Sequence, residues 1–504
     1  MKSKIQSLNW LALGAVLMLF SNGRWIIPAA AWLYPVCFLY FMRQNESGRG
    51  LLLIALVSAI INSISWWKMI PVPIPVYFLI TGILINIFSL AFLADRLMAP
   101  KINGFMSTLV FPLIWCSLEF LTSLTPKGSW FSLAYTQAGN LILLQLASLT
   151  GIWGVSFVIT WFASVVNWAL THRFDWKKIR IGGVVFISAL TSVILFGVFR
   201  INFSSPGTQT VRTASIVNDR KINTALAGCR WTDANSIQQY SSAVEENLLE
   251  KTKRAAEGGA KIVVWQESAG FLPRLEEEKL IQRASSLAAA KKIYLLMTLW
   301  SVPEDFPARL VENKLIILDT TGRIQLTYLK SNPAPPEPIL KGNGRLNVME
   351  TKFGRISPAI CFDAEFPGFI RQAGEKRAGI LFLPANDWKA IDPIHTHMAV
   401  LRAIENGFSL VRPAGQGLSI ATDNRGNILA SLDYYKTDEQ IMYADVPFRH
   451  SNTLYTKAGD WFAWICITGF MGLLLTVVFR KYFLPAGNLK IREHVHITNP
   501  PPYF

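Results

Sequence analysis

Three residues with complementary chemistry each follow an apolar run that is typical of a buried strand. They are Glu267, Lys330 and Cys361, which come after the runs Ile262–Trp265, Ile324–Leu329 and Ile356–Ile360. In open α/β sheets, ligands bind outside the carboxyl ends of the strands. A carboxylate, an ammonium group and a thiol gathered at such an edge are the groups that acyl chemistry on a cysteine needs. Acidic residues, including Asp363, follow the cysteine at once.

These residues lie in a region where strand-like and helical runs alternate, from about Thr210 to Val446. Such alternation predicts a layered α/β domain. The expected helices are Ser236–Glu257 and Leu275–Lys291, and further expected strands are Val211–Val217, Ile293–Leu299, Leu315–Asp319, Ile380–Leu383 and Ser409–Val411. A Gly in the turn Thr320–Gly322 predicts a hairpin that leads into the strand before Lys330.

The rest of the chain has the composition of a membrane protein. Of 504 residues, 51% are hydrophobic and only 16% are charged, against about 25% charged in ordinary soluble domains. About 20 apolar residues span a bilayer. Eight candidate spans are Leu8–Phe20, Trp25–Met42, Leu51–Trp67, Val76–Ala94, Phe105–Leu124, Thr150–Leu170, Ile181–Phe199 and Trp461–Val478.

The basic residues between these spans predict the orientation, because Lys and Arg accumulate on the cytoplasmic side. Ten lie before the first span or in alternate loops: Lys2, Lys4, Arg43, Arg49, Arg96, Lys101, Arg173, Lys177, Lys178 and Arg180. The other loops carry only Arg24, Lys68 and Lys127. The expected organisation is a bundle of about seven helices over 1–203, an extracytoplasmic catalytic domain over 204–450, a final span over 451–482 and a cytoplasmic tail over 483–504.

The net charge of +16 fits this cytoplasmic excess of basic residues and an affinity for anionic lipid. No basic cluster is interleaved with stacking aromatic residues, so we expect no nucleic-acid partner. The five cysteines have no metal-ligand spacing, and no metal or cofactor is expected. The sequence neither predicts nor excludes a disulfide between Cys229 and Cys361. The histidines available as bases in the polar region are His395, His397 and His450.

Each candidate residue also has a structural interpretation. A lone cysteine is often a small buried hydrophobe. Taken singly, Glu267 and Lys330 would more often be an exposed loop carboxylate and a surface lysine. Their shared position at strand ends favours function.

The order Glu267, Lys330, Cys361 resembles the triad of the nitrilase (carbon–nitrogen hydrolase) superfamily. Seven spans before such a domain and one after it resemble the apolipoprotein N-acyltransferase family. Further stretches that resemble this family are Trp115–Phe120, Gly128–Trp130, Tyr135–Gln137, Trp265–Ala269, Asn386–Trp388, Leu401–Glu405 and Tyr455–Trp461. The resemblance implies a helical membrane bundle joined to an αββα domain.

The resemblance also implies roles for single residues. Glu267 would be the general base, Lys330 the oxyanion stabiliser and Cys361 the nucleophile. Glu337 would match a second active-site carboxylate, and Asp363 stands where the family carries Glu. Trp231, Asn386 and Trp388 would contact substrate, although each could equally serve in packing or a turn.

The chain also departs from the family at three places near this site. The segment Ser331–Pro336 replaces a His-Leu-Val-Pro-Phe-Gly run, Pro384 and Ala385 precede Asn386 where Ser is usual, and Pro413–Gly417 replaces a Ser-Thr-Asn-Asn-Gly type segment. These departures leave the chemistry intact and put the substrate in question.

The implied reaction transfers an acyl chain from a phospholipid, through a Cys361 thioester, to the amino-terminal amine of a lipoprotein diacylglyceryl-cysteine. It would take place at the outer face of the bacterial cytoplasmic (inner) membrane. The alternatives are a membrane-tethered amidase with the same triad, a catalytically silent relative that binds lipid or lipoprotein, and a transporter. The last rests on Glu119, because carboxylates inside a membrane are functional suspects.

Overall fold

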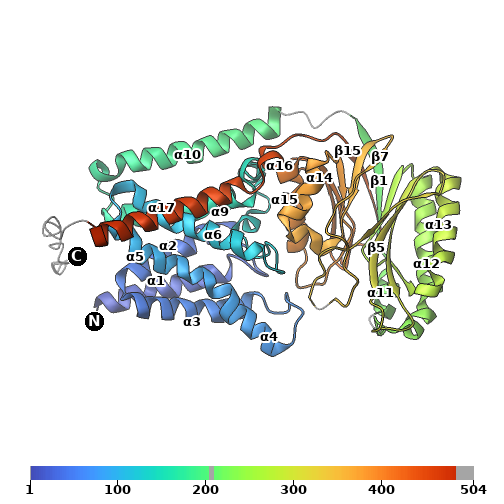
Figure 1. Cartoon of the computed structure of the whole chain (residues 1–504), viewed down its shortest axis with the longest axis horizontal. Helices are drawn as coiled ribbons and strands as arrows, with labels where there is room; N and C mark the ends of the chain where they lie inside the picture. Colours follow the sequence, from blue (N-terminus) through green and yellow to red (C-terminus); the bar gives the residue numbers. More distant parts are fainter. Residues whose placement is uncertain (1, 204–208, 227, 336, 484–504) are drawn as a thin grey trace.

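The chain forms a helical bundle, then a domain with two stacked β-sheets, then a last helix that returns to the bundle (Figure 1). The computed structural model describes residues 2–203, 209–226, 228–335 and 337–483. The predicted boundary at 204 and nearly all of the predicted tail lie outside these described residues.

The bundle contains long helices joined by short helical turns. Its helices are α1 Lys2–Leu19, α2 Pro28–Gln44, α3 Ser47–Ser65, α4 Ile74–Leu79, α5 Ser89–Met98, α6 Val110–Ser123, α7 Leu141–Leu144, α8 Ala147–Thr150, α9 Ile152–Thr171 and α10 Trp176–Phe203. After the two-sheet domain, α16 Leu454–Ala458 leads into α17 Trp461–Phe483, which packs beside α6 and α9.

Six helices in the described part of the chain are long and apolar enough to cross a membrane. They are Ser47–Ser65, Ile74–Lys101, Gly104–Ser123, Ile152–Thr171, Trp176–Phe203 and Trp461–Arg480. The first two predicted spans coincide with α1 and α2, which are shorter as apolar segments: Ile5–Leu19 in α1 and 17 residues in α2. That α1 and α2 also cross the membrane stays a prediction.

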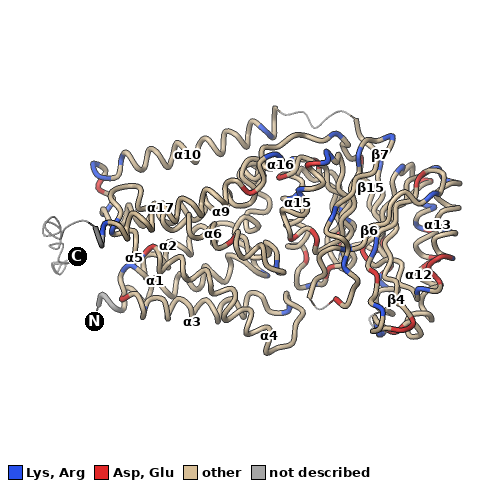
Figure 2. Tube along the Cα trace, in the orientation of Figure 1, with Lys and Arg blue, Asp and Glu red and all other residues tan. Residues whose placement is uncertain are grey.

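Charged residues are distributed as a membrane-spanning bundle requires. Figure 2 shows basic residues near the end of the bundle where α5, α10 and α17 meet, and few charges along its middle. Charges become frequent again in the two-sheet domain. Side chains inside a bilayer are mostly apolar because charges there are costly, so the two charged zones match the two sides of a membrane.

The first sheet holds two of the three candidate catalytic residues. Its order is β15-β1-β2-β4-β5-β6, with β3 beside β4. The strands are β1 Thr210–Ile216, β2 Ile262–Trp265, β3 Gly270–Pro273, β4 Tyr294–Val302, β5 Glu312–Leu318, β6 Ile324–Leu329 and β15 Ile441–Pro447. β2 runs parallel to β4, and β6 shares that direction because β5 is antiparallel to both of its neighbours. The expected hairpin before Lys330 is confirmed by the β5–β6 pairing.

The second sheet holds the cysteine strand. Its order is β14-β13-β11-β9-β8-β7, with β8, β9 and β11 parallel. The strands are β7 Met349–Thr351, β8 Gly354–Pro358, β9 Ile380–Phe382, β11 Ser409–Arg412, β13 Leu418–Thr422 and β14 Ile428–Asp433. A small pair, β10 Ala385–Asn386 with β12 Ala414–Gly415, extends this sheet toward the site.

Helices cover the outer face of each sheet and complete an αββα arrangement, as expected from the sequence (Figure 1). On the first sheet lie α12 Ala234–Glu257 and α13 Glu277–Lys291, with α11 Arg220–Leu226 at one end. On the second lie α14 Pro367–Glu375 and α15 Ile394–Asn406, which face the membrane bundle. The start of α12 is fixed by Asp233, whose carboxylate accepts hydrogen bonds from two amides of the first turn.

Alternation along the strands divides the core. Val263 and Trp265 face α12 and α13, whereas Ile262 and Val264 face the second sheet. The cluster on the second side does not end at the sheets. It continues through α15 into the membrane bundle as one connected set of buried side chains. The bundle and the second sheet therefore share a core.

Candidate active site

The carboxyl ends of β2 and β6 bring Glu267 and Lys330 into direct contact. Lys330 Nζ lies 2.8 Å from Glu267 Oε1, and the lysine side chain is wholly buried. Cys361 follows β8 at the start of the 3-10 turn η7, Cys361–Glu365. The charges of Glu267 and Lys330 both act on its thiol. The structure thus gathers the three residues at one edge of the stacked sheets.

A second carboxylate completes the surroundings of the lysine. Glu337 Oε1 and Oε2 each lie 2.8 Å from Lys330 Nζ, and the amide of Ala334 donates to Glu337 Oε2. Burial alone would favour the neutral amine. The two carboxylates outweigh it and raise the pKa of Lys330 well above its usual value. The surroundings of Lys330 therefore favour its charged form.

Glu267 is held in a single orientation by donors on both of its oxygens. Asn313 Nδ2 and Lys330 Nζ donate to Oε1, and the backbone amide of Asn386 donates to Oε2. The predicted residue Asn386 thus contacts Glu267 through its backbone, and it also lines a cavity. Since the carboxylate cannot turn away, it is preorganised for proton transfer.

The cysteine occupies a strained backbone position. Its φ is +46°, a left-handed value that β-carbon sterics disfavour. Its amide donates to Pro384 O at 2.8 Å, which anchors the start of the turn. Strain of this kind, of order 1–3 kcal/mol, is common at functional sites.

Asp363 has a structural place behind this turn. It is fully buried, and Tyr328 and the amide of Ile360 donate to its Oδ2 at 2.6 and 2.9 Å. The amide and side chain of Asn332 donate to its Oδ1 at 2.8 and 3.0 Å. Burial outweighs these hydrogen bonds and raises the pKa of Asp363. The residue ties the segment after Lys330 to the turn that carries Cys361.

The resting cysteine is a thiol. Burial first, and then the carboxylates of Glu267 and Asp387, raise the pKa of Cys361 well above its usual value, although Lys330 and Arg412 act in the opposite direction. The thiolate is the nucleophilic form. Reaction at neutral pH therefore requires a base in contact with the thiol, and Glu267 is the carboxylate whose charge acts on it most strongly.

Two cavities meet at the site. An apolar cavity of about 130 Å³ lies between bundle loops and the catalytic domain, and Cys361 forms part of its wall. Its other lining residues include Ile70, Val72, Phe131 and Phe362. A larger cavity of about 440 Å³ is lined by Glu267, Glu337 and Asn386 and by several apolar side chains.

The two predicted tryptophans lie around these cavities. Trp388 lines both of them, and its indole N–H donates to Lys68 O in the loop after α3 at 2.9 Å. Trp231 is half-exposed at the larger cavity, where its ring packs near those of Phe271 and Trp300. All of the predicted site residues except Asp363 therefore contact a cavity or the lysine–carboxylate cluster.

Sequence reasoning missed a second polar cluster beside the cysteine. The atoms of Cys361, Asp387 and His395 that could bind a metal ion lie within 4.8 Å of one another. Arg412 donates to both oxygens of Asp387 at 3.0 Å, and its Nη2 lies 2.9 Å from His395 Nδ1. A guanidinium in that position repels a metal cation, so the residues do not suit a metal site. From the sequence, His395 was identified only as one of three histidines available as bases. It lies on the same helix as Leu401–Glu405, a stretch that resembles the family, and this proximity could have pointed to it.

The structure contains no disulfide between Cys229 and Cys361. All five cysteines are free and buried, and Cys229 packs in a separate cluster with Phe271 and Trp300. Cys361 is therefore available for chemistry.

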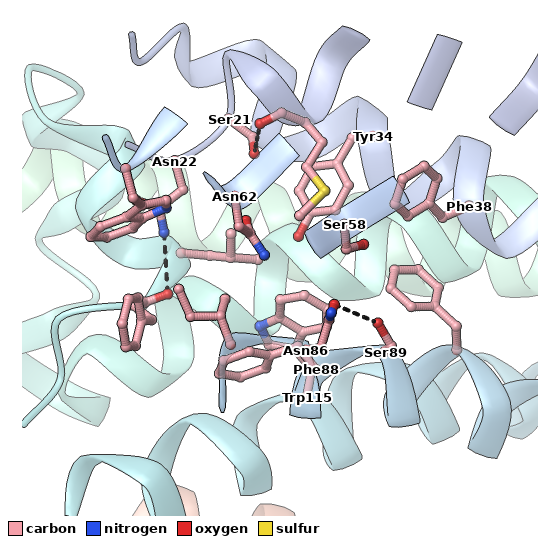
Figure 3. A pocket seen from close by; sticks show the side chains of 16 residues that line it. Ser21, Asn22, Tyr34, Phe38, Ser58, Asn62, Asn86, Phe88, Ser89 and Trp115 are labelled. Atoms are coloured by element: carbon pink, nitrogen blue, oxygen red, sulfur yellow. Dashed lines mark hydrogen bonds between the residues drawn. The ribbon is translucent and has the colours of Figure 1, made fainter. Parts of the chain in front are cut away.

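The bundle has its own small cavity, away from the catalytic residues. It has a volume of about 50 Å³ and is lined by Tyr34, Ser58, Asn62 and Trp115, among others (Figure 3). None of Glu267, Lys330 and Cys361 lines it.

The transport hypothesis loses its main support because Glu119 has a structural explanation. Its Oε1 accepts hydrogen bonds from Trp115 Nε1 and the amide of Leu133, both at 2.9 Å. Its Oε2 accepts one from Ser132 Oγ at 3.0 Å. The carboxylate therefore fixes the loop after α6 rather than facing an open path.

Known proteins resemble both halves of the chain. A family model described as carbon–nitrogen hydrolase matches residues 224–452, and one described as apolipoprotein N-acyltransferase N-terminal domain matches residues 14–165. An apolipoprotein N-acyltransferase from Geobacter metallireducens is 27% identical over 407 residues, covering 75% of each chain. Apolipoprotein N-acyltransferase 1 from Treponema denticola is 24% identical over 540 residues, covering 93% of this chain and 96% of its own.

Among solved structures, an amidase from Nesterenkonia sp. is 20% identical, covers 50% of this chain and 96% of its own, and has a TM-score of 0.38. The two family models match most of the bundle and nearly all of the two-sheet domain, and the Treponema denticola relative aligns with 93% of the chain. The chain therefore belongs to the apolipoprotein N-acyltransferase family, a multi-pass membrane branch of the carbon–nitrogen hydrolase superfamily.

Proposed function

We propose that this protein transfers an acyl chain from a phospholipid to the amino-terminal amine of a lipoprotein diacylglyceryl-cysteine, with Cys361 as the carrier. The observation that carries the proposal is the position of Cys361. It lies in the wall of an apolar cavity that bundle loops help to enclose, beside the Glu267–Lys330–Glu337 cluster. A lipid chain can thus lie against the nucleophile while its ester meets the polar groups.

In the first half-reaction Glu267 takes the proton from Cys361 Sγ. The sulfur attacks the ester carbonyl carbon of the phospholipid, and Lys330 stabilises the negative charge that develops on the carbonyl oxygen. The C–O bond then breaks, and the lysophospholipid oxygen leaves with the proton that Glu267 held. A thioester on Cys361 remains.

In the second half-reaction the neutral amine of the lipoprotein attacks the thioester carbonyl. Glu267 accepts the amine proton, the C–S bond breaks, and the proton returns to Cys361. Glu337 remains the counter-charge of Lys330 while Glu267 holds the proton, because the ammonium group lies between the two carboxylates. The larger cavity, with Trp231 at its rim, supports entry of the bulky polar acceptor there.

We also propose that the domain that carries this site lies on the outer face of the bacterial cytoplasmic membrane. The support is the basic end of the bundle, which lies opposite the catalytic domain in Figure 2 and which the positive-inside rule assigns to the cytoplasm. On this placement α1 and α2 complete eight spans, and 483–504 is a cytoplasmic tail.

The test is mass spectrometry of the Cys361 peptide after the purified full chain has been incubated with phospholipid and no acceptor. The expected result is a hydroxylamine-labile acyl adduct on Cys361 that is absent from Cys361→Ala. Adding a synthetic diacylglyceryl peptide with a free amine should then remove the adduct and yield an N-acyl peptide. An unmodified cysteine in folded protein, across several phospholipids, contradicts the proposal.

Two controls separate the alternatives. An amidase would release ammonia from small water-soluble amides without lipid, in a Cys361-dependent reaction. A silent relative would bind lipid or lipoprotein equally well with and without the Cys361 thiol and form no adduct.

A further inference from the structure

Glu365 is a buried carboxylate that the reaction above does not use. It is the last residue of η7, four positions after Cys361, and its side chain is wholly buried. Among the described residues, neither of its oxygens has a hydrogen-bond partner that meets normal geometry. Its near neighbour is His395, whose Nε2 lies 3.3 Å from Glu365 Oε1. An unpaired buried carboxylate is strongly unfavourable, so its charge must be compensated.

His395 lies between two carboxylates. It is the second residue of α15 and is only 2% exposed. Its Nδ1 lies 2.7 Å from Asp387 Oδ1, while its Nε2 faces Glu365. A neutral imidazole carries one N–H and an imidazolium carries two. The ring can therefore donate to both carboxylates at once only when it is protonated.

The surrounding charges agree with a protonated ring. The charged groups that face His395 are the carboxylates of Asp387 and Glu365 and the guanidinium of Arg412. An imidazolium makes this set neutral. Burial opposes the charged ring, as does Arg412, but the two carboxylates outweigh them and raise the pKa of His395. The Trp130 ring, 5.3 Å away between centroids, adds an aromatic neighbour that suits a cation.

Other charges reach Glu365 from its far side. Arg402 and Tyr135 both feel its charge. Arg402, however, is paired with Glu405 at 3.0 Å and donates to the Tyr135 hydroxyl at 3.2 Å. Its charge is already shared, and His395 remains the group aimed at the Glu365 oxygens.

The backbone of Glu365 is held from the membrane side. The amide and hydroxyl of Ser129, in the loop after α6, donate to Glu365 O at 2.7 and 2.8 Å. One end of the turn thus carries the nucleophile, and the other end is fixed by a bundle loop through its backbone and by α15 through its side chain.

We propose that Glu365 and His395 form a buried carboxylate–imidazolium pair that holds the nucleophile turn against α15, which makes His395 a positioning residue for Cys361. The kinetic part of this proposal rests on the proposed function, but the pair itself does not. The pair acts as a unit. Removing the imidazolium alone leaves Glu365 uncompensated, whereas removing both charges leaves a neutral contact.

Histidine NMR tests the protonation state directly. The chain has six histidines, so selective ¹⁵N labelling of the full-length protein in detergent gives few signals, and His395→Gln identifies the relevant one. We expect both ring nitrogens of His395 to be protonated at neutral pH, and the titration to move to lower pH in Glu365→Gln. A neutral His395 ring at neutral pH, or a titration that Glu365→Gln does not move, overturns the proposal.

A double-mutant cycle tests the positioning role. We expect His395→Gln to slow acyl-adduct formation on Cys361 at least tenfold, Glu365→Gln to slow it only a few-fold, and the double variant to recover most of the loss. A double variant as slow as His395→Gln, or slower, overturns the pair as a unit. Asp95→Asn is the matched control. It also removes a wholly buried paired carboxylate, bound to Arg43 at 2.8 Å in the bundle, and should leave the rate unchanged.

Alkylation of Cys361 by iodoacetamide gives a readout without lipid. The same order of variants is expected, because the reagent also needs a correctly placed thiol. If no variant, including wild type, forms an acyl adduct while the alkylation order and the NMR result hold, the acyltransferase proposal fails and the pair stands.

Discussion

Lys330 Nζ lies 2.8 Å from Glu267 Oε1 in a pocket where the lysine side chain has no exposed surface. The same nitrogen is bound by both oxygens of Glu337. One cation therefore contacts two carboxylates, the buried Glu267 and the partly exposed Glu337, so Lys330 has a structural role as well as a chemical one. Removing either partner of such a contact leaves an uncompensated charge.

Lys330→Met should be damaging in two measurable ways. It leaves Glu267 and Glu337 without their counter-charge, and losing one partner of a buried pair costs about 3–5 kcal/mol. It also removes the group that faces the developing oxyanion, which is worth about 100-fold or more in rate. Thermal unfolding and adduct formation on Cys361 measure the two effects. Lys330→Met combined with Glu337→Gln should regain part of the stability, because only Glu267 still lacks its counter-charge, without regaining the rate, and regained rate would contradict the role of the lysine.

Asp363→Asn should weaken the turn although it preserves shape. Both carboxylate oxygens of Asp363 accept two hydrogen bonds each, from Tyr328, Ile360 and Asn332. The amide NH₂ of Asn would face two of these donors, and a buried unsatisfied donor costs about 1–3 kcal/mol. We expect a lower unfolding temperature and slower thioester formation. Tyr328→Phe, which removes one donor only, should have the smaller effect, and the reverse order would refute this account.

Glu267→Gln should abolish turnover yet make the cysteine easier to ionise. Burial and the negative charge of Glu267 both raise the pKa of Cys361. Removing the charge therefore moves the ionisation of the thiol to lower pH. Iodoacetamide labelling of Cys361 across a pH series measures the midpoint, with Cys229 as the internal control. A midpoint that moves upward would show that Glu267 does not face the thiol as an anion.

Gly128→Ala should disturb the nucleophile turn from the membrane side. Gly128 has a φ of +62°, and an added β-carbon would clash with the backbone oxygen of Glu365. Gly139→Ala is the matched control, since its φ is +90° but nothing lies within 4 Å of the new atom. Both variants carry the backbone strain of about 1 kcal/mol. Only Gly128→Ala should slow adduct formation, and equal rates would exclude coupling through this contact.

The His395 pair predicts how stability responds to alkali. Because the pKa of His395 is raised in the folded protein above its ordinary value of about 6.5, its contribution is complete below that value. The contribution is lost as the pH rises through the raised pKa. The unfolding temperature of the wild type should therefore fall more steeply toward alkaline pH than that of Glu365→Gln. Parallel slopes would argue against the pair.

Much of this architecture could be predicted from the sequence because it depends on local pattern. The strand before Glu267 and the hairpin before Lys330 are short apolar runs with clear turns, and β2, β5 and β6 lie where such runs predict. Cys361 was found by the same logic, since its apolar run stands in line with those before Glu267 and Lys330, although β8 ends at Pro358 and Cys361 begins the turn that follows.

What could not be predicted depends on contacts between distant segments. His395 lies eight residues after Asp387 on a separate helix, and only the fold brings it beside Cys361. Asp363 was matched to a family position, but its four hydrogen bonds come from three residues, two of which lie more than 30 positions before it. Strands such as β13 and β15 have weaker patterns and are defined by their pairing. The shorter helix α2 shows that hydropathy alone does not settle the number of spans.

The shared core of the bundle and the second sheet bears on how this protein can be handled and how it evolves. Ile152 N in α9 donates to Glu405 in α15, and Gln145 donates to Arg425 O. Together with the connected apolar cluster, these contacts make the bundle a part of the core of the catalytic domain and more than a membrane attachment. A catalytic domain produced without the bundle would expose α15 and the cysteine turn to water and should aggregate. Exchanging either half between relatives should therefore succeed only if the residues buried between the two halves are exchanged as well.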